Sequence, residues 1–309
     1  MDSIKYDVII PLAKKDVNFV HWVVTYIRNN FEDAQSIYII TNKSLFTKLK
    51  RLVDKETCIL IDENEMLKGL SFSSIRKIVL ANNQRAGITG HYFQQFLKMG
   101  FSLTPYCKEY YLTWDSDTIP LSKISFFQNG HPLFSLKKEF RERYFEVLMQ
   151  VLGIEKQIEG SFIAEHMIFK SSIMKEMLAK IEERAEGMTW YEAMVNCTDK
   201  TRIDENIISE FEIYGNYCLA NYPNLYDFHE LRALRHAGII RGRLINKRIL
   251  RMLAYDIDLA TFEKYDSPYS LLHFKSQLKR LNDVFRNNKV SEWPVIISKI
   301  LHNESLKGY

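Results

Sequence analysis

Cysteine is scarce in this sequence of 309 residues, and long apolar runs are missing. The four cysteines are widely spaced and form no CxxC pair, which argues against a disulfide framework and a zinc site and favours a reducing compartment. A run of about 18 apolar residues, as a membrane-spanning helix needs, is absent from the sequence. The first apolar run is also too short for a secretory signal peptide. We therefore expect a cytoplasmic protein.

A strong charge of one sign is missing as well. The 42 basic and 38 acidic residues leave a net charge of +4, unlike a protein that coats nucleic acid, so we expect no nucleic-acid partner. Internal repeats and low-complexity tracts are absent too. What is present is a hydrophobic content of 46%, which is enough for a full core in one large domain or two modest ones.

The beginning of the sequence alternates between two hydrophobic patterns. Short runs rich in isoleucine and valine at 6–12, 36–41 and 58–62 have the composition of buried strands. The segments between them, 16–31 and 43–54, carry apolar residues at helical spacing. This β-α-β-α-β order is the signature of an α/β fold with a parallel central sheet that helices cover.

The same patterns continue beyond the third strand. They predict helices over 90–101, 138–152, 171–186 and 202–215, strands over 109–114 and 161–170, and a turn over 128–132. In the first of these helices, His91, Gln94, Gln95 and Lys98 fall on one polar face.

The stretch YYLTWDSDTIPL, residues 110–121, places two carboxylates directly after a predicted strand. Ligands of parallel α/β sheets collect outside the carboxyl ends of the strands. Side chains at i and i+2 of an extended chain point the same way, so Asp115 and Asp117 can converge on one hard cation. Mn²⁺ or Mg²⁺ prefers such oxygen ligands and commonly binds phosphates as well. The sequence therefore predicts a site for a metal ion and a diphosphate.

Four segments, taken in order, resemble a known group of enzymes. They are GHYFQQFLKMG (90–100), YYLTWDSDTIPL (110–121), SFIAEHMIF (161–169) and ISEFEIYGNY (208–217). They resemble GT-A glycosyltransferases, and more specifically an uncharacterised bacterial glycosyltransferase-like family of surface-polysaccharide synthesis. The resemblance implies a GT-A-type nucleotide-diphospho-sugar transferase fold over 1–225, Rossmann-like and with a mostly parallel sheet. A basic, mainly helical extension over 226–309 would pack on it.

The resemblance also implies a reaction and roles for the acidic residues. The protein would move a sugar, in a hexosyltransferase-like reaction, from a nucleotide-sugar donor to a glycan or lipid-linked glycan acceptor. Asp117 would be a direct ligand of Mn²⁺ or Mg²⁺. Asp115 would contact the ribose or a metal-bound water, and Asp62 would lie near the base or ribose.

Further donor contacts are implied for the loop after the first strand and for the helix before the acid pair. The first would lie against the nucleotide, and the second would neutralise or hydrogen-bond the diphosphate or sugar. The residues concerned are Pro11, Ala13, Lys14, Arg85, Gln94 and Lys98.

An inverting GT-A enzyme needs a carboxylate that takes the proton of the acceptor hydroxyl. Glu210 is the first candidate and Glu212 the second. Residues two apart on one helix cannot aim at the same point, so the two glutamates cannot act there together. If the reaction retains configuration, no such base is required. His166 is a candidate contact to acceptor or donor, or else a core residue. GT-A enzymes often take a third metal ligand from a C-terminal loop, and His229 and His236 are the candidates here.

Residues 231–253 carry seven lysines and arginines and no acidic residue. Because these charges repel one another, we expect an anion nearby. One candidate is a bilayer with anionic lipids, which attracts each basic residue by about 1 kcal/mol. Two other candidate anions are the sugar donor and a lipid-diphosphate acceptor. Alternatively, the segment is a solvated basic helix that packs on the domain. Peripheral attachment at the inner face of the cell membrane is therefore expected.

Two other functions compete with the transferase. The letters DSDTI, 115–119, also fit the nucleophile motif of haloacid-dehalogenase-type phosphatases, in which the first Asp attacks phosphorus. That motif normally follows the first strand of its fold, whereas here about 110 residues of predicted α/β structure precede it. The third reading is a non-catalytic module that binds nucleotides or carbohydrates.

Overall fold

The computed structural model describes residues 3–54, 56–138, 142–198, 206–264 and 266. The chain divides into two compact units, the first comprising 1–235 and 247–261 and the second 236–246 and 262–309. Strands that follow residue 225, β9 and β11, pair with β7 and β5 of the first unit. Among the helices described, none combines the length and the apolar character that crossing a membrane requires.

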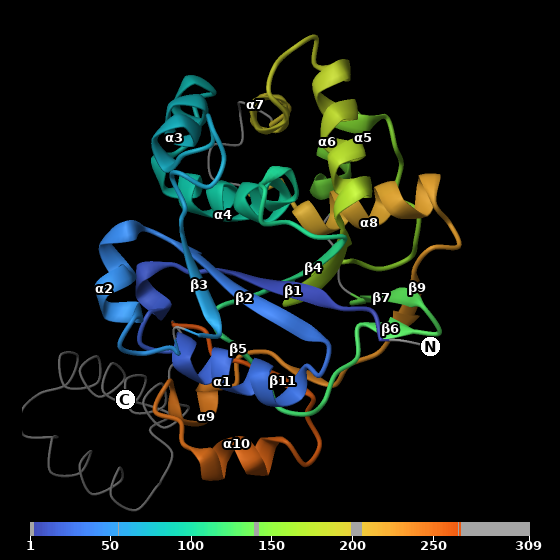
Figure 1. Ribbon diagram of the computed structural model, residues 1–309. Helices are drawn as coiled ribbons and strands as arrows, with labels where there is room; N and C mark the ends of the chain where they lie inside the picture. Colours follow the sequence, from blue (N-terminus) through green and yellow to red (C-terminus); the bar gives the residue numbers. More distant parts are fainter. Residues whose placement is uncertain (1–2, 55, 139–141, 199–205, 265, 267–309) are drawn as a thin grey trace, which may run out of the picture. The chain divides into compact units, whose positions relative to one another are not determined.

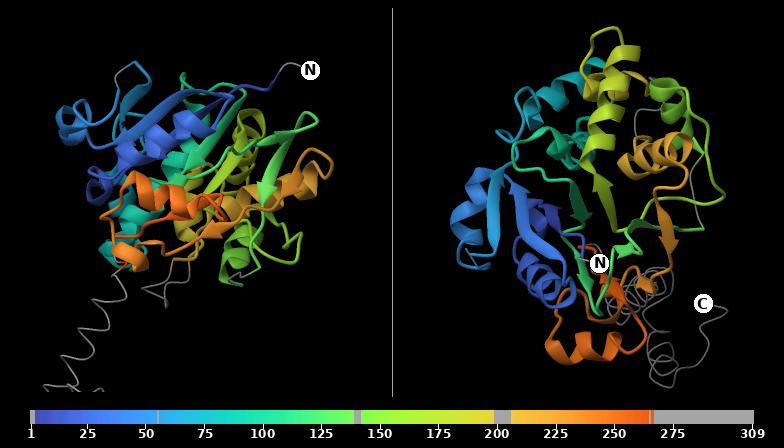
Figure 2. Two further views of the ribbon diagram at one scale, coloured as in Figure 1. Left: turned by 90° about the horizontal axis from the view of Figure 1, so that it is seen from below. Right: turned by 45° about the vertical axis from the view of Figure 1, so that its right-hand side comes forward.

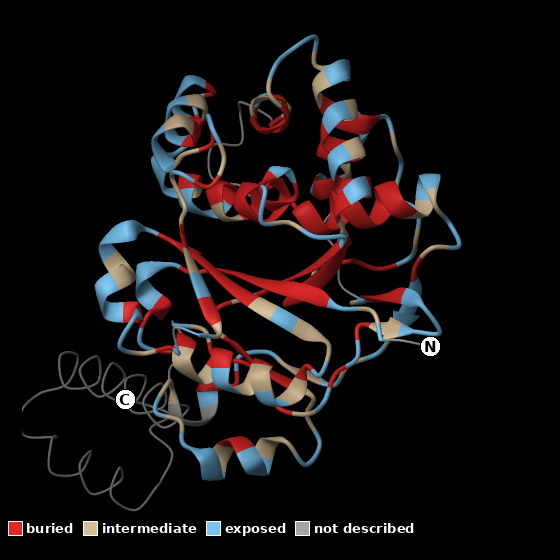
Figure 3. Ribbon diagram, in the orientation of Figure 1, coloured by how far each residue is buried: buried red, intermediate tan, exposed pale blue. Residues whose placement is uncertain are grey.

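A five-stranded sheet with the order β3-β2-β1-β4-β8 forms the centre of the first unit (Figure 1). The first four strands in the chain run parallel and β8 runs antiparallel to β4, which confirms the predicted mostly parallel sheet of an α/β fold. All residues of β1 and β4 are buried (Figure 3), which explains why their sequences are continuous apolar runs. The strands are β1 (Tyr6–Pro11), β2 (Ala34–Thr41), β3 (Cys58–Asp62), β4 (Tyr110–Trp114) and β8 (His166–Lys170).

Helices cover both faces of this sheet (Figures 1 and 2). On one face lies α1 (Val20–Asn30), and on the other lie α4 (Thr89–Gly100) and α8 (Glu210–Asn221). Nine of the twelve residues of α4 are buried, so this helix belongs to the core. The remaining helices of the first unit are α2 (Phe46–Leu49), α3 (Phe72–Ala81), α5 (Arg143–Leu152), α6 (Ser171–Arg184), α7 (Trp190–Asn196) and α10 (Lys247–Leu253), with the 3₁₀ turns η1 (Lys14–Asp16), η2 (Lys43–Leu45), η3 (Ala86–Ile88) and η4 (Phe101–Leu103).

Two small sheets complete the first unit. One has the order β10-β11-β5 and the other β6-β7-β9. The predicted turn at 128–132 is confirmed, because Asn129 and Gly130 adopt positive φ and join β6 to β7 in a hairpin. The strands are β5 (Thr118–Pro120), β6 (Phe127–Gln128), β7 (His131–Ser135), β9 (Asp227–His229), β10 (Ala233–Leu234) and β11 (Leu259–Thr261).

The helix predicted over 202–215 has different ends in the structure. It begins at Glu210, because the Ser209 side chain accepts the main-chain N–H of Glu212 and caps the helix. It continues through Gly215 to Asn221, since this glycine serves close packing and does not end the helix. Residues 202–205 lie outside the described part of the chain.

Two further predicted elements are shorter than expected. The strand predicted over 161–170 is formed only from His166 to Lys170, and α5 begins at Arg143. In the second unit, the described residues form α9 (Gly238–Arg241). Most of the extension predicted beyond it, 267–309, lies outside the described residues.

Candidate functional site

The acid pair leaves the sheet at the carboxyl end of β4, a strand between β1 and β8, as the sequence predicted. The main-chain N–H of Asp115 donates to the carbonyl oxygen of Glu165, and the N–H of Thr118 donates back to Asp115. These bonds form a tight turn that carries both acids, Asp115 and Asp117, each half-buried.

A buried ammonium group joins two acids of the site. Lys98 Nζ lies 3.0 Å from Asp115 Oδ1 and 2.9 Å from Glu210 Oε1. The side chains of Lys98 and Glu210 are 6% and 5% exposed, whereas that of Asp115 keeps 30% of its surface open to solvent. Three separate sequence segments, which carry Lys98, Asp115 and Glu210, therefore meet at one point, and Asp115 is the most exposed of the three residues.

The two charges on either side of Lys98 change its protonation. Burial alone would lower the pKa of Lys98, but the carboxylates of Asp115 and Glu210 together raise it above its ordinary value. The pKa of Asp115 is raised, because burial and the charges of Glu210 and Glu165 outweigh the stabilising effect of Lys98. An arriving cation would supply the positive charge that this set of acids lacks.

Sequence reasoning missed two residues beside this site. The Glu165 carboxylate lies 3.3 Å from Lys137 Nζ and is close enough to raise the pKa of Asp115. Asp16, which is 2% exposed, accepts a hydrogen bond of 3.1 Å from the hydroxyl of Ser116. Glu165 lies within the motif SFIAEHMIF and was open to detection there, whereas the sequence around Asp16 carries no comparable signal.

A pocket of about 420 Å³ opens at the carboxyl ends of β1 and β2 and beside α4. Four of the predicted donor contacts line it, namely Pro11, Ala13, Lys14 and Gln94. The predicted Asp62 does not line it; its side chain accepts the N–H of Asn64 at 3.1 Å, and the next residue, Glu63, lines the pocket instead. Arg85 is exposed just before η3 and is not among the lining residues.

The other candidate base lies elsewhere on α8. Glu212 is fully buried, accepts a hydrogen bond from the Ser161 hydroxyl and lies 3.4 Å from the Asn216 amide. Burial raises the pKa of this carboxyl. As the spacing required, Glu210 and Glu212 point to different partners, and only Glu210 contacts Lys98.

Two of the candidate histidines share one hydroxyl. The Ser135 hydroxyl lies 3.1 Å from His166 Nε2 and 2.8 Å from His229 Nε2. His166 is 4% exposed and stacks on Trp114, so it belongs to the aromatic core beside the acid pair. Burial lowers the pKa of His166 well below its ordinary value and that of His229 to about 4. In the second unit, His236 Nδ1 lies 3.0 Å from Asp266 Oδ1.

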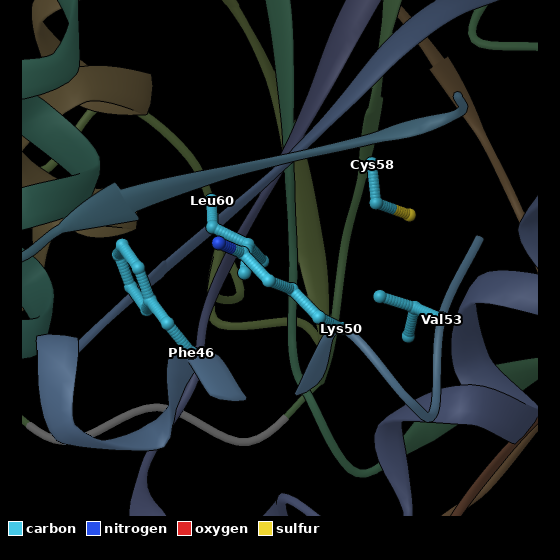
Figure 4. Close-up of a pocket in the computed structure, with 5 residues that line it drawn as sticks. All are labelled: Phe46, Lys50, Val53, Cys58 and Leu60. Atoms are coloured by element: carbon cyan, nitrogen blue, oxygen red, sulfur yellow. The ribbon is translucent and has the colours of Figure 1, made fainter. Parts of the chain in front are cut away.

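A second pocket, of about 270 Å³, lies between α2 and the edge strand β3 (Figure 4). Phe46, Val53, Cys58 and Leu60 make it apolar, with Lys50 as its one charged lining residue. It lacks the converging polar groups of a substrate site, and no residue singled out from the sequence lines it.

Within the described residues, no group of three or more His, Cys, Asp and Glu side chains is arranged to hold a metal ion. Asp115 and Asp117 nevertheless offer hard oxygen atoms, and Mg²⁺ is commonly held by one or two carboxylates together with waters and substrate phosphates. The residues present therefore fit a cation that shares its ligands with a bound diphosphate.

Several solved structures resemble this chain at low identity. Mouse xyloside xylosyltransferase 1 aligns at 12% identity and a TM-score of 0.47, over 86% of this chain and 99% of that one. The galactosyltransferase LgtC aligns at 8% identity and a TM-score of 0.41, over 83% of this chain and 86% of that one. The bifunctional glycosyltransferase WbbM aligns at 13% identity and a TM-score of 0.43, over 85% of this chain and 46% of that one. These similarities are too distant to assign a reaction.

No curated protein matches the sequence. A protein family does, and its match runs over residues 5–240, which include β1 to β10 and the whole of the site described above. The chain therefore belongs to the family of unknown function DUF6492.

Proposed function

We propose that this chain is a metal-dependent glycosyltransferase that moves a sugar from a nucleotide-sugar donor to a glycan or lipid-linked acceptor, in bacterial surface-polysaccharide synthesis. One observation supports it most: α4 contributes to both halves of the site. Phe93 and Gln94 line the pocket, and Lys98, one turn later, contacts Asp115. The rise of about 1.5 Å per residue separates Gln94 from Lys98 by roughly 6 Å along the helix axis. A nucleoside diphosphate, with a ring at one end and charge at the other, suits this spacing.

Asp115 and Asp117 would hold Mn²⁺ or Mg²⁺. When bound, the ion would stabilise the negative charge that develops on the departing diphosphate. The chain itself supplies the Lys98 ammonium, which is held in place by two acids and offers a fixed positive charge beside them. Such a preorganised charge in a partly buried site can stabilise a diphosphate or the transferred sugar without further rearrangement.

Glu210 would accept the proton of the acceptor hydroxyl if the reaction inverts configuration. Its carboxylate lies at the start of α8 and is fixed 2.9 Å from Lys98 Nζ, beside Asp115. His229 and His236 stay as the proposed third metal ligand. His229 bonds to Ser135, and the bonds of His236 lie within the second unit, so either ring would exchange a present partner for the metal.

The test is release of nucleoside diphosphate from a panel of nucleotide sugars, with and without Mn²⁺. We expect metal-dependent turnover that Asp117→Asn reduces by more than about 100-fold, since even outer-shell partners of a metal contribute 10- to 100-fold. Asp227→Asn, an exposed acid on β9, is the matched control and should keep activity. Phosphate release from an aryl phosphate would instead support the phosphatase. Ligand binding without turnover, unchanged in Asp117→Asn, would support the binding module.

We also propose peripheral contact with an anionic membrane through α10 and Tyr255, which lies two residues beyond the end of this helix. Lys247 and Arg251 are exposed on this helix, and Met252 and Tyr255 are 69% and 88% exposed. Basic residues beside exposed apolar side chains suit the surface of a bilayer. Leu250 of the same helix is buried and packs into the unit.

Vesicle sedimentation tests this contact. The protein should pellet with vesicles that contain phosphatidylserine and not with phosphatidylcholine alone, and the double variant Arg251→Glu and Met252→Ser should stay in solution. The matched control reverses two exposed charges on α3, Arg76→Glu and Lys77→Glu, and should still pellet. Equal binding of both variants would refute the assignment to α10.

A further inference from the structure

The pocket beside α4 contains one acidic lining residue, Glu63, at a fixed position. The main-chain N–H of Glu63 donates to Thr41 at 3.0 Å, which extends the pairing of β2 and β3 by one residue. The Asn42 side chain hydrogen-bonds to its carboxylate, while the Asn42 oxygen accepts from the Ser44 N–H at 3.1 Å. Asn42 and Ser44 also line the pocket. A polar group held in this way can read the edge of a ligand.

The same pocket has an aromatic side chain at its rim. Phe72 is 40% exposed and packs edge-to-face on the buried Phe93 at a centroid distance of 5.9 Å. Both rings line the pocket. A supported, partly exposed ring offers a surface on which a nucleobase can stack, and such stacking accepts every base. Discrimination among bases must therefore come from the polar lining.

An ionised carboxylate accepts hydrogen bonds and donates none. Guanine presents two adjacent donors, its ring N1–H and its amino group, which match the two oxygens of a carboxylate. Uracil presents one N–H between two carbonyl oxygens, and the amino groups of cytosine and adenine stand beside a ring nitrogen that accepts. Each of these three would place a lone pair against the carboxylate, so Glu63 suits guanine best.

We infer that this pocket selects guanine through Glu63, so that the donor is a GDP-linked sugar. This inference rests on the proposed transferase and names its donor class. One bidentate pair of this kind discriminates between bases by an amount that corresponds to about 10-fold or more in affinity.

Calorimetric titration of the whole chain with GDP, UDP, CDP and ADP, in the presence of Mn²⁺, tests the inference. We expect GDP to bind about 10-fold or more tightly than the other three. Tighter or equal binding of UDP, CDP or ADP would overturn the guanine assignment and leave the transferase intact. Failure of all four to bind would instead refute the transferase, so the two failures are distinguishable.

Variants then assign the preference to one side chain. Glu63→Gln replaces one acceptor oxygen by an N–H₂ donor and should weaken GDP binding about 10-fold while leaving UDP binding equal or tighter. Glu65→Gln is the matched control, because Glu65 is exposed, lies two residues further on and does not line the pocket. Thermal unfolding without ligand confirms that both variants fold. An unchanged preference for GDP in folded Glu63→Gln would overturn the assignment.

Discussion

The hydroxyl of Ser116 donates a hydrogen bond of 3.1 Å to the carboxylate of Asp16, and both side chains are buried. Ser116 separates the two acids of the pair, Asp115 and Asp117, whereas Asp16 ends η1, which follows β1 and begins with the pocket residue Lys14. One hydrogen bond thus connects the proposed metal site to the loop of the proposed nucleotide pocket.

Ser116→Ala should therefore weaken metal binding as well as stability. We expect a loss of about 1–3 kcal/mol in the free energy of unfolding, because a buried carboxylate loses a partner. The apparent affinity for Mn²⁺ should fall about 10-fold, as for other residues that orient a metal ligand. Urea unfolding and Mn²⁺ titration measure the two effects.

Ser122→Ala is the matched control, since the Ser122 hydroxyl donates to Asp258 at 2.9 Å outside the site. It should lower stability without changing the affinity for Mn²⁺. Equal Mn²⁺ affinities of Ser116→Ala and the wild type would show that Ser116 does not position the acid pair.

Lys98→Met should destabilise the protein, because it leaves Asp115 and Glu210 facing each other without the cation between them. Removing one partner of a buried ion pair typically costs about 3–5 kcal/mol. Adding Glu210→Gln to Lys98→Met removes one of the stranded charges and should restore a large part of that loss. Urea unfolding of the two variants and of Glu210→Gln alone forms a double-mutant cycle. Strict additivity in that cycle would contradict the ion pair.

The sequence allowed prediction of those features that a local pattern determines. The apolar runs predicted β1 to β4, because the strands of a parallel sheet have nearly continuous apolar sequences. The position of Asp115 and Asp117 followed from the strand that precedes them. These are properties of contiguous residues and need no knowledge of distant partners.

The contacts of Lys98 could not be predicted in the same way. Helical periodicity placed Lys98 on a polar face, where a lysine ordinarily faces solvent. In the structure, however, the Lys98 side chain is buried. Two acids from segments far apart in the chain make this burial tolerable. Likewise, the sequence predicted Asp62 near the base or ribose and did not single out the pocket residue Glu63, because which of two adjacent acids lines a pocket depends on one residue of register.

The stability of the protein should fall as the pH drops from about 6.5 to 4, in part because of His229. Burial lowers the pKa of His229 from 6.5 to about 4, so between these values the unfolded state binds a proton that the folded state does not. His229→Gln should reduce the loss of unfolding free energy between pH 6.5 and 4 by about 1–2 kcal/mol, a value that allows for the partly exposed ring. His166, the pKa of which is also lowered, keeps part of the slope.

Chemical denaturation at a series of pH values measures this effect. His131→Gln is the matched control, since His131 is an exposed histidine of the neighbouring strand β7. It should leave the slope between pH 4 and 6.5 unchanged. A slope that is as steep in His229→Gln as in the wild type would show that His229 is not buried as described.

Gly215→Ala should damage the packing that holds Glu210 in place. A Cβ atom at Gly215 would lie 2.5 Å from the ring of Phe162, which is fully buried, so the ring or the helix would have to shift. Overpacking of this kind typically costs about 1–3 kcal/mol, although alanine favours helices more than glycine does. Gly87→Ala is the matched control, because a Cβ there meets no atom within 4 Å. Thermal unfolding should show a lower midpoint only for Gly215→Ala, and equal midpoints would mean that α8 does not approach Phe162 so closely.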